Sequence, residues 1–253
     1  MQVLVTRPEP EAARWVADLR SRGLDALALP LIDIGPAPNP WALRAAQEAL
    51  PGQQAVMFVS VNAVRGFFAG AQLHWPAGTG AWAPGAGTAA ALREAGVPAS
   101  GIATPPRGAA QWDSEHLWPV VAAQVQPGFR LLVVRGADRE GRPAGRDWLA
   151  GQVEAAGGTV SSVAAYVRRL PGWSAAQRLA AERAQTAECV WLFSSSEALR
   201  HLAELMPQAD WSQPTALATH PRIAENAARL GFAHVRTTAP TLAAVVASIE
   251  SLR

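Results

Sequence analysis

The sequence contains no lysine, and its 22 residues of the lysine-plus-arginine class are all arginine. This excludes a Schiff-base lysine, a pyridoxal-phosphate lysine and a P-loop, whose lysine contacts the phosphates. Its single cysteine, Cys189, excludes an internal disulfide and a cysteine-based metal cluster. The chain also lacks an apolar run of the roughly 20 residues that span a bilayer. Since its first residues read as a strand rather than a signal peptide, we expect a cytoplasmic protein.

The charges of the sequence are nearly balanced, with a net charge of +2. Its arginines are scattered and form no basic run, so the sequence does not indicate a nucleic-acid partner. Its five histidines show no metal-ligand spacing, and we expect no metal site. Arginines within a binding site would still suit a carboxylate or phosphate ligand, because a guanidinium group can donate two parallel hydrogen bonds to either.

Short apolar runs alternate with segments of helical periodicity along the whole chain. Such alternation is typical of a parallel sheet with helices on both faces, so we predict an α/β fold. Glycine and proline separate the elements, and we expect a loop at 136–145. The predicted strands include 3–5, 27–34, 55–59, 131–134, 159–167, 189–193, 215–218 and 234–237.

The second half of the chain repeats the pattern of the first. Residues 3–7 align with 131–135 at an offset of 128 (131 − 3), whereas 58–60 and 83–96 align with 193–195 and 218–231 at an offset of 135 (193 − 58). Three blocks in the same order indicate an internal duplication. We therefore predict two similar parallel-sheet lobes of the flavodoxin or Rossmann kind.

A proline- and glycine-rich breaker follows the second predicted strand of each half, at Gly35 to Pro40 and at Leu170 to Gly172. Equivalent linkers suggest that the chain passes twice between the lobes. One lobe would then contain residues 1–35 plus 168–253, and the other 36–167. A simpler division near residue 127 is the alternative, and the residues by themselves favour neither.

Small polar residues, glycines and arginines collect where predicted strands end and helices begin. Ligands of open parallel sheets bind at the carboxyl ends of the strands, where helix N-termini offer free N–H groups to carboxylates or phosphates. Ser, Thr and Asn are also ordinary helix caps, but their occurrence in both halves favours ligand contact. The candidates are Thr6, Arg7, Ser60, Asn62, Gly85, Gly87, Thr88, Arg135, Ser194, Ser195, Thr219 and His220.

Tyr166 is the only tyrosine, and it lies at the end of a predicted strand beside the second linker. Packing is one interpretation of this residue, but a phenol there could also donate a hydrogen bond or protonate a leaving group. The sequence shows no Ser-His-Asp arrangement and no carboxylate pair. An enzyme of this kind would act by binding and orienting a reactive substrate.

Several of these residues occur in short segments with a fixed order along the chain. They are Val3 to Pro8, Leu29 to Ile34, Phe58 to Val64, Gly85 to Ala89, Tyr166 and Phe193 to Ser195. In this order they resemble the uroporphyrinogen-III synthase family, and the resemblance covers essentially the whole chain.

The resemblance implies a monomeric, cofactor-free hydro-lyase with two α/β lobes joined by a two-stranded connector. Such an enzyme cyclises hydroxymethylbilane, a linear tetrapyrrole polycarboxylate, to uroporphyrinogen III for tetrapyrrole biosynthesis. Loss of hydroxyl gives an azafulvene, attack at the ring D carbon gives a spiro intermediate, and ring D is inverted before closure. Tyr166 falls on the family tyrosine that is proposed to assist hydroxyl departure. Residues of the cleft would include Thr6, Arg7, Ser60, Thr88, Ser194 and Ser195.

Two other functions are compatible with the same residues. A non-catalytic, two-lobed binding protein for a small anion would share the helix N-termini and the linkers. A nucleotide-sugar transferase with two α/β lobes has less support, because no acidic or glycine-rich donor motif stands out.

Overall fold

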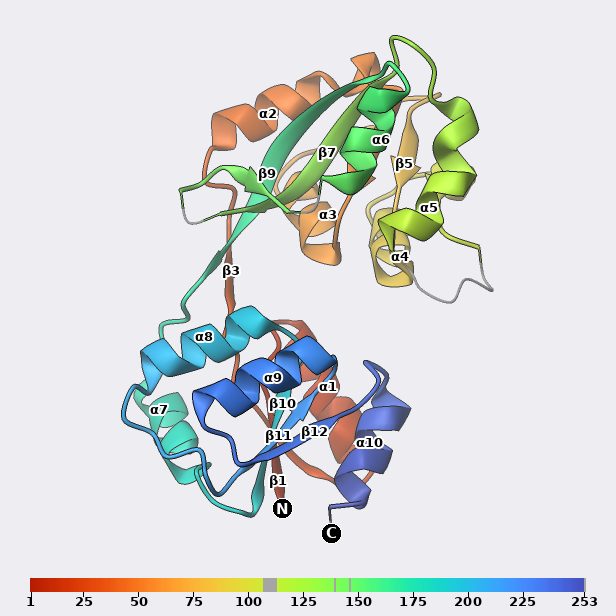
Figure 1. Ribbon diagram of the computed structural model, residues 1–253. Coiled ribbons are helices and arrows are strands. Elements are labelled where there is room, and N and C mark those ends of the chain that lie inside the picture. Colours follow the sequence, from red (N-terminus) through yellow and green to blue (C-terminus); the bar gives the residue numbers. More distant parts are fainter. Residues whose placement is uncertain (107–112, 139, 146, 253) are drawn as a thin grey trace. The chain divides into compact units, whose positions relative to one another are not determined.

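The computed structural model describes residues 1–106, 113–138, 140–145 and 147–252. The chain forms two compact units: unit 1 comprises Met1–Ile34 and Arg169–Arg253, and unit 2 comprises Gly35–Arg168. Unit 1 is therefore built from two separate stretches of sequence, and Figure 1 shows the elements of each unit. No helix in the described ranges is long and apolar enough to cross a membrane.

Unit 1 contains a five-stranded sheet in the order β12-β11-β10-β1-β2, and all of its neighbouring strands are parallel. This order is the flavodoxin order, in which the first strand lies between the second and the third. The strands are β1 (Gln2–Val5), β2 (Asp25–Ala28), β10 (Cys189–Phe193), β11 (Thr215–Ala218) and β12 (His234–Thr237). The helices are α1 (Glu11–Arg20), α7 (Ala175–Arg183), α8 (Ser196–Leu205), α9 (Pro221–Leu230) and α10 (Leu242–Glu250).

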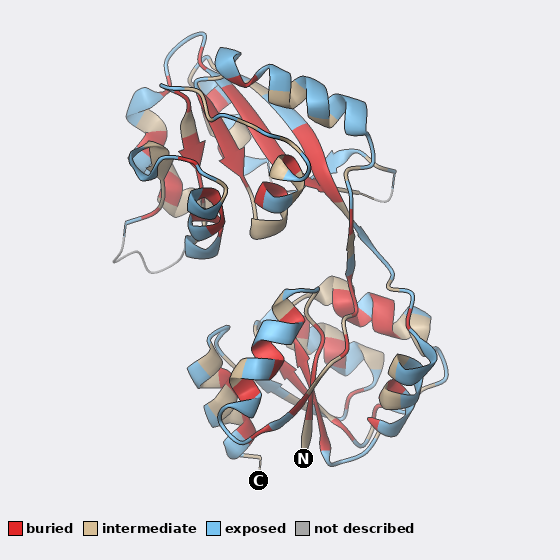
Figure 2. Cartoon of the chain, turned by 180° about the vertical axis from the view of Figure 1, so that it is seen from behind, coloured by how far each residue is buried: buried red, intermediate tan, exposed pale blue. Residues whose placement is uncertain are grey.

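Both faces of this sheet are covered by helices. Successive side chains of a strand point to opposite faces, so Trp191 and Phe193 of β10 pack with α8 and α9. Val190 and Leu192 pack with α1 and α10 on the other face. The central strands β1, β10 and β11 are accordingly almost entirely buried (Figure 2). The apolar runs of the sequence thus follow from burial on two sides.

Unit 2 is built on a second sheet in the order β3-β9-β7-β4-β5-β6, with β8 paired to β7 in antiparallel fashion. Its strands are β4 (Ala55–Phe58), β5 (Gly80–Trp82), β6 (Ile102–Ala103), β7 (Arg130–Ala137), β8 (Pro143–Ala144) and β9 (Thr159–Arg169), whereas β3 (Asp33–Gly35) begins in unit 1 and enters unit 2 only at Gly35. Its helices are α2 (Pro40–Glu48), α3 (Val61–Phe68), α4 (Ala86–Glu94), α5 (Ser114–Val121) and α6 (Trp148–Ala155). Its 3₁₀ helices are η1 (Leu50–Gly52), η2 (Ala99–Gly101) and η3 (Ala122–Gln124).

The helices of unit 2 also lie on both faces of its sheet. Met57 of β4 packs with α5 and α6. Its neighbour Phe58 points the other way and meets Phe67 of α3 edge-on, with ring centroids 5.5 Å apart. The predicted fold class, α/β with two parallel-sheet lobes, is therefore confirmed.

Strand pairing preserves the internal duplication residue by residue. Val3 pairs with Val190 in unit 1, and Leu131 pairs with Ala55 in unit 2. Val3 corresponds to Leu131 at the offset of 128 (131 − 3), and Ala55 corresponds to Val190 at the offset of 135 (190 − 55), so equivalent residues pair in the two units. In each unit, strands from one half of the sequence pair with strands from the other half. In unit 1, β1 and β2 form one sheet with β10, β11 and β12. In unit 2, β4, β5 and β6 form one sheet with β7 and β9.

Two local predictions are wrong. Residues 27–34 form two strands rather than one, because β2 ends at Ala28 and β3 begins at Asp33. Pro30 lies between them and has no N–H for a strand ladder. The segment 136–145 is not a simple loop either: it contains the end of β7 and the whole of β8, and position 139 lies outside the described residues.

Candidate active site

A cavity of about 310 Å³ lies in unit 2 at the carboxyl ends of its strands. From β4 the chain continues to β5 and β6 on one side, and from β7 it continues to β9 on the other. The cavity therefore lies where the strand order reverses, which is the usual ligand site of open α/β sheets. It is lined by Met57, Val59, Pro84, Asp113, Ser114, Gly136, Ala144, Gly145, Tyr166 and Arg168.

Tyr166 lines this cavity from the end of β9 and is only 2% exposed. Its phenol oxygen lies 3.2 Å from the hydroxyl of Ser60. It also accepts a hydrogen bond of 3.2 Å from Nη2 of Arg168. The hydroxyl of Tyr166 is therefore held by polar groups at the cavity, which packing alone does not require.

A β-bulge positions Tyr166. Arg135 of β7 pairs with Ala164, but Gly136 pairs with Tyr166, so Ala165 is an extra residue in β9. Such a bulge re-aims the side chain that follows it. The phenol lies directly on Gly136, where an added Cβ would be 2.8 Å from Cζ and 3.0 Å from the hydroxyl oxygen of Tyr166.

Replacing Gly136 by alanine is therefore expected to displace the phenol and, for the activity that the family resemblance implies, to lower turnover roughly 10- to 100-fold, because small misplacements of a reacting group are costly. Steady-state kinetics measures this effect. Gly52→Ala is the matched control, since a Cβ at Gly52 would meet nothing within 4 Å. A Gly136→Ala variant with wild-type turnover would contradict the placement of the phenol.

Five more predicted residues of unit 2 lie at the N-termini of α3 and α4. Ser60 is the N-cap of α3, and its Oγ accepts the N–H of Ala63 at 3.2 Å. Gly85 is the N-cap of α4 and supplies no side-chain cap. A Cβ on Gly87 would lie 3.5 Å from Val61, so the first turns of the two helices lie side by side. Asn62 is also in the first turn of α3, and Thr88 is buried in α4.

Arg135 is 4% exposed and does not line the cavity. Its Nη1 donates to the carboxylate of Asp147 at 2.6 Å, just before α6. The adjoining hairpin of β7 and β8 is fixed by Asp138, which accepts the N–H of Arg142 at 2.8 Å. That backbone hydrogen bond lowers the pKa of Asp138, and the Asp138 carboxylate raises the pKa of Arg142. The hairpin thus holds Ala144 and Gly145 at the cavity wall.

In unit 1 the predicted residues lie at the ends of β1, β10 and β11. Thr6 is 1% exposed, and its hydroxyl donates to the carbonyl of Leu192 at 2.7 Å. Arg7 donates to Glu11 at 2.7 Å, and its guanidinium lies 4.4 Å from the ring centroid of Trp15. Both residues therefore have structural contacts within unit 1.

The remaining predicted residues lie at the N-termini of α8 and α9. Ser195 caps α8 by accepting the N–H of Glu197 at 3.1 Å. His220 caps α9 through Nδ1, which accepts the N–H of Arg222 at 3.1 Å. Thr219 donates its backbone N–H to Phe193 at 3.0 Å, and Ser194 directly precedes the α8 cap. Ser60, Ser195 and His220 thus all act as helix caps.

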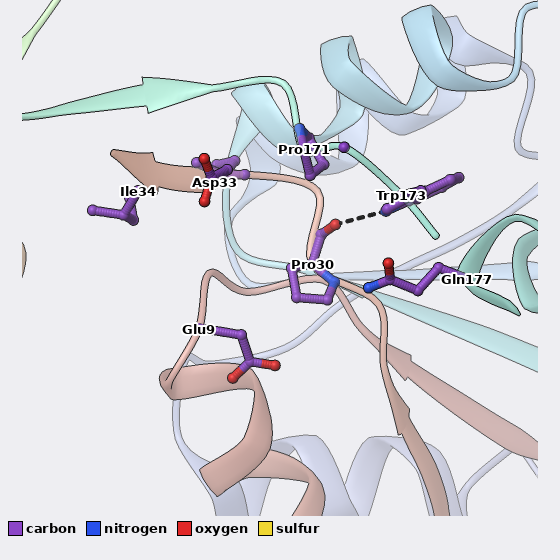
Figure 3. A pocket seen from close by; sticks show the side chains of 9 residues that line it. Glu9, Pro30, Asp33, Ile34, Pro171, Trp173 and Gln177 are labelled. Carbon is purple, nitrogen blue, oxygen red and sulfur yellow. Dashed lines mark hydrogen bonds between the residues drawn. The ribbon is translucent and has the colours of Figure 1, made fainter. Parts of the chain in front are cut away.

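Unit 1 has its own cavity, of about 290 Å³, beside the start of β3 (Figure 3). Trp173 lines it and donates its indole N–H to the carbonyl of Pro30 at 2.9 Å. The carboxylates of Glu9 and Asp33 also line it, and none of the predicted site residues does. Its lining has two carboxylates, whereas the cavity beside Tyr166 has an arginine and a phenol together with the carboxylate of Asp113.

A model of the family described as uroporphyrinogen-III synthase HemD matches residues 13–247. The chain belongs to this family. The fold is similar to that of uroporphyrinogen-III synthetase from Helicobacter pylori, with 14% identity and a TM-score of 0.62 over 100% of this chain and 99% of that chain. It is also similar to a mutant uroporphyrinogen III synthase from the extremely thermophilic bacterium Thermus thermophilus, with 18% identity and a TM-score of 0.57 over 100% of this chain and 98% of that chain. The predicted family resemblance is thus confirmed.

The Tyr166 cavity of this HemD-family chain is lined by residues that were not predicted from the sequence as ligand contacts. Arg168 follows Tyr166 by two residues on the same strand, and the period of two could have revealed it. Asp113 and Ser114 also line the cavity, and neither is among the candidates named from the sequence. Asp113 does cap α5, accepting the N–H of His116 at 2.9 Å. Within the described residues of this HemD-family chain, no group of three or more His, Cys, Asp or Glu side chains could hold a metal.

Proposed function

We propose that this HemD-family protein is a uroporphyrinogen-III synthase that acts as a monomer without a cofactor. It converts hydroxymethylbilane to uroporphyrinogen III with loss of water and inversion of ring D. The observation that carries the proposal is the single tyrosine of the chain, which lines a cavity and has its hydroxyl 3.2 Å from both Ser60 and Arg168. A phenol held in this way is suited to protonate a leaving hydroxyl.

The proposed first step moves one proton and breaks one bond. Tyr166 gives its proton to the hydroxyl of the substrate's hydroxymethyl group, and the C–O bond breaks as water leaves with the bonding electrons. The lone pair of the pyrrole nitrogen forms a C=N bond in the ring, and the ring π electrons that it displaces form the exocyclic C=C bond. The pyrrole N–H proton then restores the phenol, and the azafulvene that remains is neutral. The substrate's own reactivity supplies the later steps, so the site mainly holds it in position.

The acid groups of the substrate require donors, and helix N-termini supply them without lysine. The free N–H groups and positive dipole ends of α3 and α4 suit carboxylates. We propose that Ser60, Asn62, Gly85, Gly87 and Thr88 contact the substrate there. We propose contacts with the substrate also for Thr6, Arg7, Arg135, Ser194, Ser195, Thr219 and His220.

Product analysis tests this function. The protein is incubated with hydroxymethylbilane, the products are oxidised to porphyrins, and the isomers are separated. We expect the type III isomer with native protein and the type I isomer, which forms spontaneously, with heat-inactivated protein. Type I alone in both samples, together with tight binding of a small anion, would favour a binding protein instead.

A further inference from the structure

Arg168 has no assigned role, yet it is the charged side chain in direct contact with the phenol. Its Nη2 lies 3.2 Å from the hydroxyl oxygen of Tyr166, and its guanidinium carbon lies 5.6 Å from the centroid of the ring. Both side chains line the same cavity. Because they are two residues apart on β9, the strand itself keeps them on one face and at a fixed spacing.

We propose that Arg168 is a positioning residue that directs the proton of Tyr166 toward the bound substrate. The proposal rests on the proposed function. A guanidinium group has donors only, so the phenol oxygen is the acceptor in the bond between Arg168 and Tyr166. The proton of the phenol must therefore point away from Arg168.

Ser60 offers that proton an acceptor before a substrate arrives. Its Oγ already accepts the N–H of Ala63, and its hydroxyl lies 3.2 Å from the phenol oxygen. A hydroxyl oxygen has a second lone pair that can accept from Tyr166. Arg168 thus turns the proton of the phenol away from itself, with Ser60 as an acceptor within its reach, and a substrate hydroxyl in the cavity can replace Ser60 as acceptor.

Arg168 also faces the charge that the proposed step creates. When Tyr166 has given up its proton, the phenolate oxygen carries a negative charge beside the guanidinium group. A hydrogen bond from a guanidinium group to a phenolate is stronger than one to a neutral phenol, so the contact strengthens as the C–O bond breaks. An interaction that strengthens during the reaction raises kcat rather than lowering KM.

A double-mutant cycle tests this role. Arg168→Leu is expected to lower kcat roughly 10- to 100-fold, the effect of losing a hydrogen bond to a charged group. In a Tyr166→Phe background the same substitution is expected to cost less than about twofold, because the partner is gone. Arg168→Lys, which keeps a charged donor, should recover part of the loss. An equal loss in both backgrounds would overturn the role of Arg168.

Arg169→Leu is the matched control, because Arg169 is the adjacent arginine and pairs with Asp33 at 3.4 Å. It is expected to keep the kcat of the wild type. A second readout needs no turnover: since Tyr166 is the only tyrosine, tyrosine labelled with ¹³C at Cζ gives a single resonance. Arg168→Leu should shift this resonance in the absence of substrate, and Arg169→Leu should leave it in place.

The outcomes separate the two proposals. A wild-type protein that forms no type III isomer overturns the proposed function, whether or not the resonance moves. A resonance that does not move in Arg168→Leu, with an active wild type, overturns the role of Arg168 alone. A shifted resonance and a non-additive cycle together support it.

Discussion

Replacing Tyr166 by phenylalanine is expected to lower kcat by about 100-fold or more, because general acid catalysis contributes on the order of 10²- to 10⁴-fold. The substitution removes one oxygen and keeps the ring that packs on Gly136. Substrate binding should change little, since the acid groups of the substrate are expected to contact helix N-termini. The loss should therefore appear in kcat rather than in KM, as measured by the rate of type III formation.

The stability of the Tyr166→Phe variant separates chemistry from packing. Loss of the hydrogen bonds to Ser60 and Arg168 should cost about 1–2 kcal/mol of unfolding free energy. Trp191→Phe is a suitable control, because the indole of Trp191 donates a buried hydrogen bond to Ala184 in the core of unit 1. It should lower the melting temperature without lowering kcat at 25 °C. A Tyr166→Phe variant with the kcat of the wild type would remove Tyr166 from the mechanism.

Replacing Gly66 by alanine is expected to destabilise the protein by at least about 2 kcal/mol, because overpacking against rigid backbone is costly. Gly66 lies within α3, where alanine normally improves a helix. Here an added Cβ would clash with the carbonyl oxygen of Ala165 and lie 2.9 Å from its carbonyl carbon. Ala165 is the extra residue of the bulge that positions Tyr166, so turnover should fall as well.

Thermal unfolding checks this prediction, and Gly151→Ala is its matched control. Gly151 lies within α6, and a Cβ there would meet nothing within 4 Å. Gly151→Ala should raise stability by about 0.5–1 kcal/mol, the usual gain in a helix. The same substitution should therefore have opposite signs in two helices of one unit. A stabilised Gly66→Ala variant would show that α3 does not pack tightly on the bulge.

The alternation of strands and helices was predictable because burial on both faces requires apolar strands and amphipathic helices. The duplication was predictable at the level of single residues. Its two offsets relate the pair of Val3 and Val190 in unit 1 to the pair of Leu131 and Ala55 in unit 2. The break at Pro30 was missed because the apolar residues around it continue the pattern of a strand, although they belong to a connection.

Contacts between distant residues could not be predicted from local patterns. Tyr166 and Ser60 are 106 residues apart, and Thr6 and Leu192 are 186 apart. The sequence indicated that each polar residue ends a strand, but the hydrogen bonds of each depend on which strands become neighbours. The bulge at Ala165, whose carbonyl lies against Gly66, could not be predicted either, since nothing in the residues 159–169 marks an extra position.

The partition of hydroxymethylbilane between its two cyclic products tests the central claim most directly. Spontaneous closure to the type I isomer competes with the enzyme, so the type III fraction is measured over a series of protein concentrations. We predict that type III becomes nearly the whole product at high protein concentration, and that Tyr166→Phe needs about 100-fold more protein to reach the same fraction. A product that remains type I at every concentration would contradict the account.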